Sequence, residues 1–374
     1  MQREGDFGGY VEAGKLAWNQ VYIYSAHRNT WPPFMSIITI PLYWLDAISF
    51  FGLRFIWLVG IVIAYWHIFK WTLFTFFQQK LVLKLKTTET NQIALTDAAF
   101  LAPFLLTFRI FIEEVSNLQV NVYLLWLCLL AFDLAQKNRT FLSGIVLASL
   151  MATKVYPIII LPFLVFKKKF RWLLFTLVGL AITHLSVLAF FGLDKTSLYV
   201  EWYVKQVALG FDCNHFNQSL WSWVCGLFSH TSRFNEFFFN LTSLDVSQTK
   251  LISLSIIALA AIYVAYHFIQ NKKAEHQLAY QYIISLSFIP VFSPLAWKCY
   301  FVFLVPVVIA LFYQLRNSNK KFFLVIPLLL ITFSSELFIG NTLSDYTESL
   351  GFITLSSFFI SLFATTEIFR KHTP

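Results

Sequence analysis

The sequence predicts an all-α polytopic membrane protein, and three observations support this prediction. Hydrophobic residues make up 58% of the 374 residues and charged residues only 13%, about half their share in soluble globular domains. Aromatic residues reach 19%, with 43 Phe and 12 Trp, which suits lipid contact and the aromatic belts at membrane interfaces. Apolar runs near the length of a spanning helix, about 20 residues, recur along the chain.

The apolar runs follow one another to the end of the chain. They comprise residues 50–78, 93–112, 120–135, 170–192, 248–269, 278–292, 300–315, 322–340 and 350–369. A further run at 141–166 is interrupted near its middle by Lys154 and Pro157. Residues 35–47 are expected to add an interfacial helix.

Basic residues gather in the short connections between these runs and at the chain end. They are Lys80, Lys84, Lys86, Lys137, Arg139, Lys167, Lys168, Lys169, Arg171, Lys272, Lys273, Arg316, Lys320, Lys321, Arg370 and Lys371. The positive-inside rule places such connections in the cytoplasm. The run at 141–166 then begins and ends inside, so we expect a broken hairpin of two half-helices that meet near Lys154 beside a polar cavity.

Counting the hairpin as two gives about eleven membrane segments. The outer face then holds residues 1–33, 113–119, 194–247, 293–298 and 341–349. We expect one integral membrane domain, 1–374, with 1–33 as an outer catalytic loop and 194–247 as an outer substrate loop. An odd number of full spans places Met1 outside, so we expect a signal peptide or a helix to precede it.

The net charge of +9 is explained by this topology, and no nucleic-acid partner is expected because no basic–aromatic binding motif is present. No CxxC or HExxH spacing appears, so no metal and no cofactor are expected. Cys213 and Cys225 share the outer loop 194–247, where an oxidising compartment would allow them to pair.

The opening stretch brings carboxylates, aromatics and a cation to the outer face. Asp6, Tyr10, Glu12 and Arg28 lie in it, and Pro32-Pro33 fixes the chain as it enters the membrane. A carboxylate here is a candidate general base. The alternative is a solvated loop whose Tyr and Trp residues are interfacial anchors.

A second candidate site lies in the outer loop 194–247. His215, Asn217 and Gln218 precede an apolar stretch. Amides hydrogen-bond sugar hydroxyls, and neighbouring aromatic rings cover the apolar face of a sugar. The alternative is a helix start capped by Asn217 or Ser219.

Two lysines stand out against the apolar background. Lys154 lies between two apolar halves, where a charge is costly and a functional role is the default hypothesis. Lys298 follows Trp297 at the outer end of a run and could neutralise an anion at headgroup level. For both lysines the alternative is a side chain that extends to the interface.

In order along the chain, these residues resemble polyprenyl-phosphate-sugar-dependent glycosyltransferases of the GT-C fold, in particular the family 87 mannosyltransferase type. The matching positions are Asp6-Phe7, Tyr10, Ala13, Pro32-Pro33-Phe34, Pro41-Leu42, Gln119, Asn121, Lys154, Pro157, Asn217-Gln218-Ser219-Leu220, Ser293-Pro294, Trp297 and Tyr300. The family pattern usually has a transmembrane helix before the Asp and a His before the last Tyr, where this chain has Lys298 and Cys299.

The resemblance implies a GT-C-like helical bundle and an inverting transfer of a hexose, mannose being favoured, from a polyprenyl-phosphate carrier to a hydroxyl of a lipid or glycan acceptor. It places the site on the periplasmic face of a bacterial inner membrane, with membrane lipids as further partners. Asp6 is then the expected general base, with Glu12 as the fallback. Lys154, Lys298, His215 and Arg28 would bind the donor phosphate, and Tyr10, Asn217, Gln218 and Trp297 the sugar or acceptor.

Other functions remain open from the residues alone. A lipid or glycan transporter or flippase would also use an intramembrane lysine and broken helices. A polymerase or ligase of surface polysaccharide would share the outer-face site. A structural membrane protein would use the outer loops only as anchors.

Overall fold

The computed structural model describes residues 5–26, 28–208, 213–229, 237, 239–271 and 276–368. The basic residues Lys272, Lys273, Arg370 and Lys371 lie outside this part of the chain. The chain divides into two compact units. Unit 1 comprises Met1–His67 and Glu113–Gly210, and unit 2 comprises Ile68–Ile112 and Phe211–Pro374.

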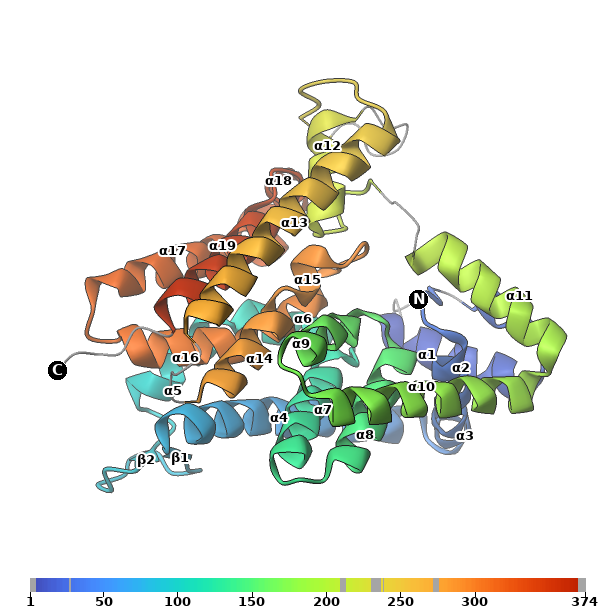
Figure 1. The fold of residues 1–374 in the computed structure, drawn as a ribbon, viewed down its shortest axis with the longest axis horizontal. Coiled ribbons are helices and arrows are strands. Elements are labelled where there is room, and N and C mark those ends of the chain that lie inside the picture. The colour runs from blue at the N-terminus through green and yellow to red at the C-terminus, as the bar shows by residue number, and fades with distance from the viewer. Residues whose placement is uncertain are drawn as a thin grey trace. The chain divides into compact units, whose positions relative to one another are not determined.

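Unit 1 is built from helices in its described residues (Figure 1). They are α1 (Gly5–Trp18), η1 (Ile23–Ser25), α2 (Pro33–Ile38), α3 (Ile40–Ile48), α7 (Asn121–Gln136), α8 (Thr140–Thr153), η2 (Tyr156–Ile159), α9 (Ile160–Phe166), α10 (Phe170–Phe191), α11 (Leu193–Tyr203) and the π-helical turn η3 (Val204–Ala208). Two further helices, α4 (Phe50–Phe77) and α6 (Phe108–Ser116), contribute residues to both units.

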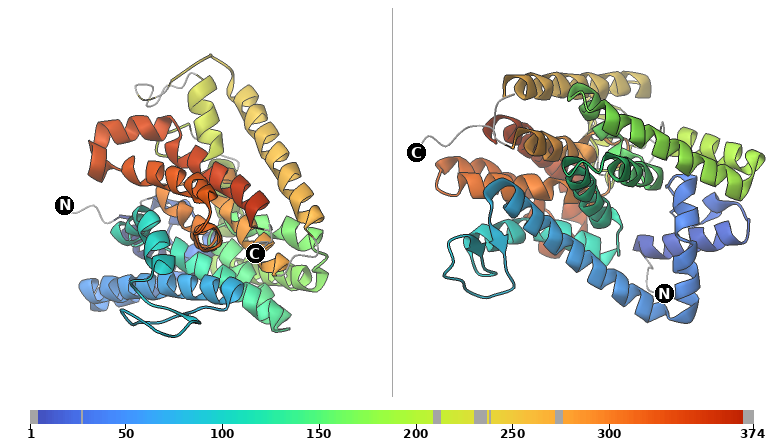
Figure 2. Two further views of the ribbon diagram at one scale, coloured as in Figure 1. Left: turned by 90° about the vertical axis from the view of Figure 1, so that its left-hand side faces the viewer. Right: turned by 60° about the horizontal axis from the view of Figure 1, so that its bottom comes forward.

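Unit 2 adds one short parallel strand pair to its helices, in which Lys80 is opposite Gln92 and Leu81 opposite Ile93. Its elements are β1 (Lys80–Leu81), β2 (Gln92–Ile93), α5 (Ala98–Leu106), α12 (Leu220–Phe228), α13 (Val246–Gln270), α14 (Gln277–Ser287), α15 (Ile289–Phe292), η5 (Lys298–Leu304), α16 (Val305–Leu315), η6 (Asn319–Lys321), α17 (Phe322–Phe333), α18 (Glu336–Ser349) and α19 (Phe352–Glu367). Both views in Figure 2 show α13, in gold, as a long straight helix.

Small residues let α8 and α10 pack closely in unit 1, where the two helices lie side by side (Figure 1). Gly144 and Ala148 lie one turn apart on α8, the small-xxx-small spacing common at interfaces between membrane helices. A Cβ on Gly144 would lie 2.6 Å from the backbone of Phe175, and a Cβ on Gly179 would lie 2.6 Å from Ala148. Residues 144 and 148 therefore face 175 and 179, so the two helices run parallel and begin at the same end.

Several helices have the length and apolar composition to cross a membrane, as the sequence predicts. They are Phe50–Phe77, Phe170–Phe191, Val246–Gln270 and Lys298–Leu315. Within the part of the chain that the structure describes, two bent pairs raise the total from 4 to 6 if each is one span. The chain is thus an all-α polytopic membrane protein, but the predicted count of about eleven segments is not confirmed. The break expected in the run 141–166 is present, because α8 ends at Thr153 and Lys154 is extended, with φ −144° and ψ 126°.

The structure adds helices within the expected outer loops and breaks within two of the expected spans. The loop 1–33 contains the 14-residue helix α1, and the loop 194–247 contains most of α11 and all of α12. The turn expected at 341–349 is the second half of α18. The runs 93–112 and 322–340 are each broken: α5 ends at Leu106 and α17 ends at Phe333. Hydropathy did not predict these helices and breaks, because it identifies apolar runs but does not detect polar helices or the points where the backbone of a run breaks.

A disulfide joins Cys213 to Cys225 across 12 residues and holds the segment before α12 against that helix. The predicted N-cap is confirmed at Ser219, whose side chain accepts a hydrogen bond from the backbone N–H of Ser222. The sequence alone left open whether these two cysteines pair, and in the structure they do.

We expect the Cys213→Ser, Cys225→Ser double variant to lose about 2–3 kcal/mol of unfolding free energy, because the crosslink removes conformational freedom from the unfolded chain. Unfolding of the purified protein in detergent, with and without a thiol reductant, measures this loss. The reductant should destabilise the native chain and leave the double variant unchanged. A native chain that unfolds identically with and without reductant would contradict the crosslink.

Candidate active site

Helix α1 determines which of the two candidate carboxylates lies near the other polar residues of unit 1. Asp6 and Tyr10 are four residues apart and therefore share one face of the helix. Glu12 is six residues from Asp6 and lies on a different face. Asp6 keeps 17% of its side chain exposed, whereas Tyr10 is fully buried.

Gln119 connects to both residues on this face of α1. Its Nε2 donates to Oδ2 of Asp6 at 2.5 Å, and its Oε1 accepts from the Tyr10 hydroxyl at 3.1 Å. A tight turn after α6 places this amide: Leu118 has φ +46° and the Gln119 N–H donates to the carbonyl of Glu114. Both polar atoms of the buried Gln119 amide are thus fixed, and its N–H group is directed at the Asp6 carboxylate.

Arg28 brings positive charge to the other oxygen of Asp6. Its Nη1 lies 3.3 Å from Oδ1 of Asp6. The guanidinium carries five N–H donors and 48% of the side chain is exposed, so it can also reach an anion in solvent. Tyr24 helps to hold the loop after α1 that carries Arg28, because its hydroxyl donates to the carbonyl of Trp31 at 3.1 Å.

Aromatic rings surround Tyr24 and keep its loop in place. Tyr24 stacks on Trp202 with ring centroids 3.8 Å apart and contacts the edge of Tyr199 at 5.9 Å. Burial is the main cause that raises the pKa of Tyr24 far above its usual value, and burial likewise raises the pKa of Tyr203. Their hydroxyls therefore stay protonated over the whole physiological range.

Behind Gln119, a buried network connects Lys154 to Glu114 through Asn121. The Lys154 ammonium donates to Oδ1 of Asn121 at 2.9 Å, and the Tyr156 hydroxyl donates to the same oxygen. Nδ2 of Asn121 contacts Oε1 of Glu114 at 3.2 Å and Oε1 of Gln119 at 3.3 Å. Glu114 and Asn121 are fully buried and Lys154 is 4% exposed. Hydrogen bonds therefore run without a break from Asp6 to Lys154.

The backbone break at Lys154 makes this network possible. Because α8 ends at Thr153, the chain is extended at Lys154, whose ammonium reaches Asn121 at the start of α7. Glu114 also accepts a hydrogen bond from the backbone N–H of Val122 at 3.1 Å, one of the donors that the first turn of a helix leaves without an intrahelical partner. The bend of 115° between α6 and α7 brings Glu114 and Asn121 together.

In unit 2, the amides of Asn217 and Gln218 bind backbone groups. Asn217 donates to the carbonyl of Pro294 at 3.0 Å and accepts from the N–H groups of Ser219 and Ala296. The Gln218 side chain donates to the carbonyl of His215 at 2.5 Å, and its backbone N–H donates to Ala296. These bonds join the segment before α12 to residues 294–296.

Lys298, predicted to bind phosphate, lies beside two carboxylates of α18 in unit 2. Its Nζ lies 2.6 Å from Oε1 of Glu348 and 3.3 Å from Oε1 of Glu336. Glu348 has no exposed side-chain surface and also accepts from Ser344 at 3.2 Å. Arg109 approaches the same carboxyl at 3.5 Å. Within unit 2 the positive charge of Lys298 is therefore matched by protein carboxylates.

His215 and Trp297 complete the list of predicted site residues. His215 is 2% exposed, lies 3.6 Å from Oδ1 of Asp345 and packs against Phe216 and Phe237 with ring centroids 3.9 and 4.7 Å away. Trp297 is half-buried at the N-cap of η5. Within the described residues, no group of three or more His, Cys, Asp or Glu side chains has the arrangement of a metal site.

The two carboxylates beside Lys298 should differ sharply in their effect on stability. We expect Glu348→Gln to lower the unfolding free energy by about 3 kcal/mol, because it leaves two cationic side chains facing a neutral amide in a buried site. Glu336→Gln is the matched control, since its side chain is 52% exposed and should cost less than about 1 kcal/mol. Denaturant titrations in detergent measure both. Equal losses would contradict the role given to Glu348.

The sequence predicted several of the residues that unit 1 brings together. Asp6, Tyr10, Arg28 and Lys154 belong to one connected network, whereas Glu12 lies on a different face of α1 from Asp6. The sequence did not single out Glu114 or Tyr156. Glu114 was overlooked because it fell in a stretch predicted to be an outer loop. Two adjacent acids, Glu113-Glu114, between two apolar runs in a chain with only 19 acidic residues are the signal that could have identified it.

A comparison with protein-family models found one described as Glycosyltransferase family 87, which matches residues 29–294. This range covers more than two thirds of the chain and includes Gln119, Asn121 and Lys154. Asp6 and Arg28 precede it, and Lys298 follows it. Searches of the curated proteins and of the solved structures found no match.

Proposed function

The chain belongs to glycosyltransferase family 87 and is therefore a glycosyltransferase, and we propose that it transfers a hexose from a polyprenyl-phosphate carrier to a hydroxyl of a lipid or glycan acceptor. Membership in this family favours an enzyme over a transporter or a purely structural membrane protein. We propose a GT-C-like arrangement of its helices, in line with the break at Lys154 and the polar residues gathered beside α1.

One observation supports the proposed mechanism above all: the Asp6 carboxylate is partly exposed and is held at both oxygens. Gln119 fixes one oxygen and Arg28 lies at the other. A base that removes a proton during attack must be oriented towards the acceptor hydroxyl. This fixed and partly exposed carboxylate is therefore the one proposed to face the acceptor hydroxyl, whereas Glu12 lies on another face of α1.

In the proposed reaction, Asp6 takes the proton of the acceptor hydroxyl as its oxygen attacks the anomeric carbon. The bond between that carbon and the phosphate oxygen breaks on the opposite side, and its electron pair leaves with the polyprenyl phosphate. The anomeric configuration is therefore inverted. Negative charge builds up on the phosphate, and Arg28, exposed next to Asp6, is placed to stabilise it.

Lys154 is proposed to act on this site indirectly. It is buried and hydrogen-bonded to Asn121, so its first effect is to orient Asn121 and, through it, Gln119. Direct contact between Lys154 and the donor phosphate remains a second proposal. Tyr10 is likewise proposed to position Gln119 rather than to contact sugar, because its side chain is fully buried.

The predicted site residues of unit 2 are proposed to have structural roles within that unit. Because Asn217 and Gln218 bind backbone groups and Lys298 pairs with Glu348, we propose that they shape the segment before α12. The disulfide in this segment favours an oxidising compartment, in line with a site on the periplasmic face of a bacterial inner membrane.

The donor class is tested with purified protein, an acceptor lipid extract, and hexose supplied either as the polyprenyl phosphate or as the nucleotide sugar. We expect labelled product only from the polyprenyl-phosphate donor. Product formed from the nucleotide sugar alone would overturn the donor assignment and leave the glycosyltransferase activity itself intact.

A further inference from the structure

A basic cavity lies at the common end from which α8 and α10 start in unit 1. It has a volume of about 280 Å³, near the lower end of the range of small-molecule sites. Three cationic side chains line it together with polar and aromatic residues. They are Lys168, Lys169 and Arg171, with Asn138, Thr140 and Phe170.

Two turns of the same backbone conformation build this cavity. In the first, Asn138 has φ +60° and the N–H of Arg139 donates to the carbonyl of Leu134. In the second, Lys168 has φ +54° and the N–H of Lys169 donates to Leu164. The N-cap residues that follow are also alike: Arg139 has φ −88° and ψ 50°, and Lys169 has φ −86° and ψ 53°.

The side chain at the left-handed position differs between the two turns. Asn tolerates this conformation, as at residue 138, but for a lysine the left-handed conformation costs roughly 1 kcal/mol of conformational energy. Lys168 therefore adds a positive charge to the cavity at a cost in backbone energy. A residue kept in an unfavourable conformation is a reason to look for a function at that place.

The electrostatics of the cavity favour an anion. Three cations within one cavity repel one another, and an anion among them relieves this repulsion. The parallel packing of α8 and α10 adds the partial positive charges of two helix N-termini at the same end. The chemistry that matches these groups is a phosphate, since Lys and Arg both bind its oxygens.

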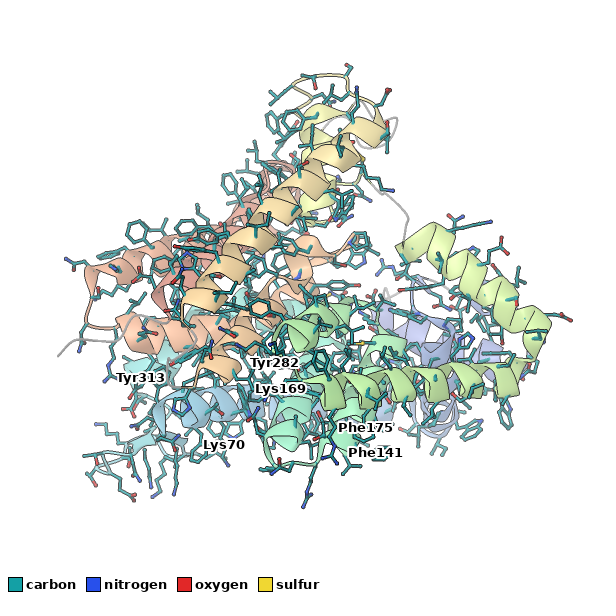
Figure 3. The ribbon with its side chains drawn as sticks, viewed as in Figure 1. Lys70, Phe141, Lys169, Phe175, Tyr282 and Tyr313 are labelled. Carbon is teal, nitrogen blue, oxygen red and sulfur yellow. A yellow bond between two sulfur atoms is a disulfide. The ribbon has the colours of Figure 1, made fainter. Side chains whose placement is uncertain are left out.

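The surroundings of the cavity favour a phosphate that carries acyl chains. Phe170 is 60% exposed and Leu174 is 56% exposed on α10, and Phe141 is 52% exposed on α8. The rings of Phe141 on α8 and Phe175 on α10, both labelled in Figure 3, meet edge to face at 5.4 Å. In a membrane protein, such exposed side chains beside a basic pocket contact lipid chains while the cations contact the headgroup.

We propose that the basic cavity binds the phosphodiester headgroup of an anionic phospholipid. The positive-inside rule assigns this end of α8 and α10 to the cytoplasmic leaflet, so the lipid would anchor the start of both helices. It would thereby hold α8, which ends at Thr153, directly before Lys154. The proposal does not depend on the donor or on the role of Asp6.

Binding is tested by native mass spectrometry of the full chain in a neutral detergent, with phosphatidylglycerol or phosphatidylcholine added. The Lys168→Asn, Arg171→Gln variant removes two charges and keeps a residue that tolerates the left-handed turn. Lys84→Asn, Lys86→Gln is the matched control, because these exposed lysines lie in unit 2. Inorganic phosphate is added as a competitor in a separate series.

We expect the native chain to bind phosphatidylglycerol at least tenfold more tightly than phosphatidylcholine. The cavity variant should lose at least fivefold of the affinity for phosphatidylglycerol, and the control should lose none. The thermal midpoint of the cavity variant in phosphatidylcholine should not fall, which excludes misfolding. Unchanged binding by the cavity variant, equal binding of both lipids, or displacement by millimolar inorganic phosphate would each overturn the lipid site.

Discussion

Replacing Asp6 with Asn is expected to lower the rate of sugar transfer by about 10²–10⁴-fold, the range that a positioned general base contributes. The amide keeps the size of the side chain but cannot accept the acceptor's proton. The rate at saturating donor and acceptor, measured with radiolabelled donor and purified protein, reports this loss. Donor affinity should change far less than the rate, because the contacts assigned to the phosphate come from Arg28.

Glu12→Gln is the control for this experiment. It makes the same chemical change six residues further along α1, on a face away from Gln119. We expect its transfer rate to stay within about twofold of the native rate, because a carboxylate that takes no part in proton transfer does not supply the rate gain of a general base. A large loss with Glu12→Gln and a small one with Asp6→Asn would transfer the role of base to Glu12.

The second large effect is expected at Lys154. Replacing it with Met should lower the unfolding free energy by about 3–5 kcal/mol, because Glu114 and the Asn121 oxygen would lose their cation in a buried site. This is a large part of the about 5–15 kcal/mol by which folded proteins are typically stable. Thermal and denaturant unfolding in detergent measure it.

A double-mutant cycle separates the structural from the catalytic role of Lys154. Glu114→Gln alone should also destabilise, whereas the Lys154→Met, Glu114→Gln pair should lose at least about 2 kcal/mol less than the sum of the single losses. A pair that is stable but has a strongly raised KM for the donor would support direct contact between Lys154 and the phosphate. Additive losses would contradict the coupling through Asn121.

The sequence predicted the membrane-embedded helical class because that class depends on composition and on the length of apolar runs, both of which are local. It also predicted the break at Lys154, since a charge and Pro157 interrupt an apolar run at that place. Helix α1 was not anticipated, because its glycines and mixed polarity lack a clear helical periodicity. The bend between α6 and α7 follows Leu118, whose positive φ is uncommon for a non-glycine residue and is not signalled by the sequence.

The candidate site was likewise predictable only in part: its residues could be selected from the sequence, but not the way they connect. Asp6, Arg28 and Lys154 could be selected because each has an unusual chemistry for its place in the chain. Their connection could not, since it depends on Gln119, Asn121 and Glu114, which are brought together by one tight turn and one bend. Lys298 was assigned to a phosphate because Glu348, its closest carboxylate, lies 50 residues away in the sequence.

The anomeric configuration of the product tests the central claim most directly. Purified protein is incubated with a polyprenyl-phosphate hexose of known configuration and an acceptor, and the new glycosidic bond is assigned by NMR coupling constants. Direct displacement assisted by Asp6 predicts a product of inverted configuration only, formed by the native chain and lost with Asp6→Asn. A product of retained configuration, or inverted product formed at the native rate by Asp6→Asn, would contradict it.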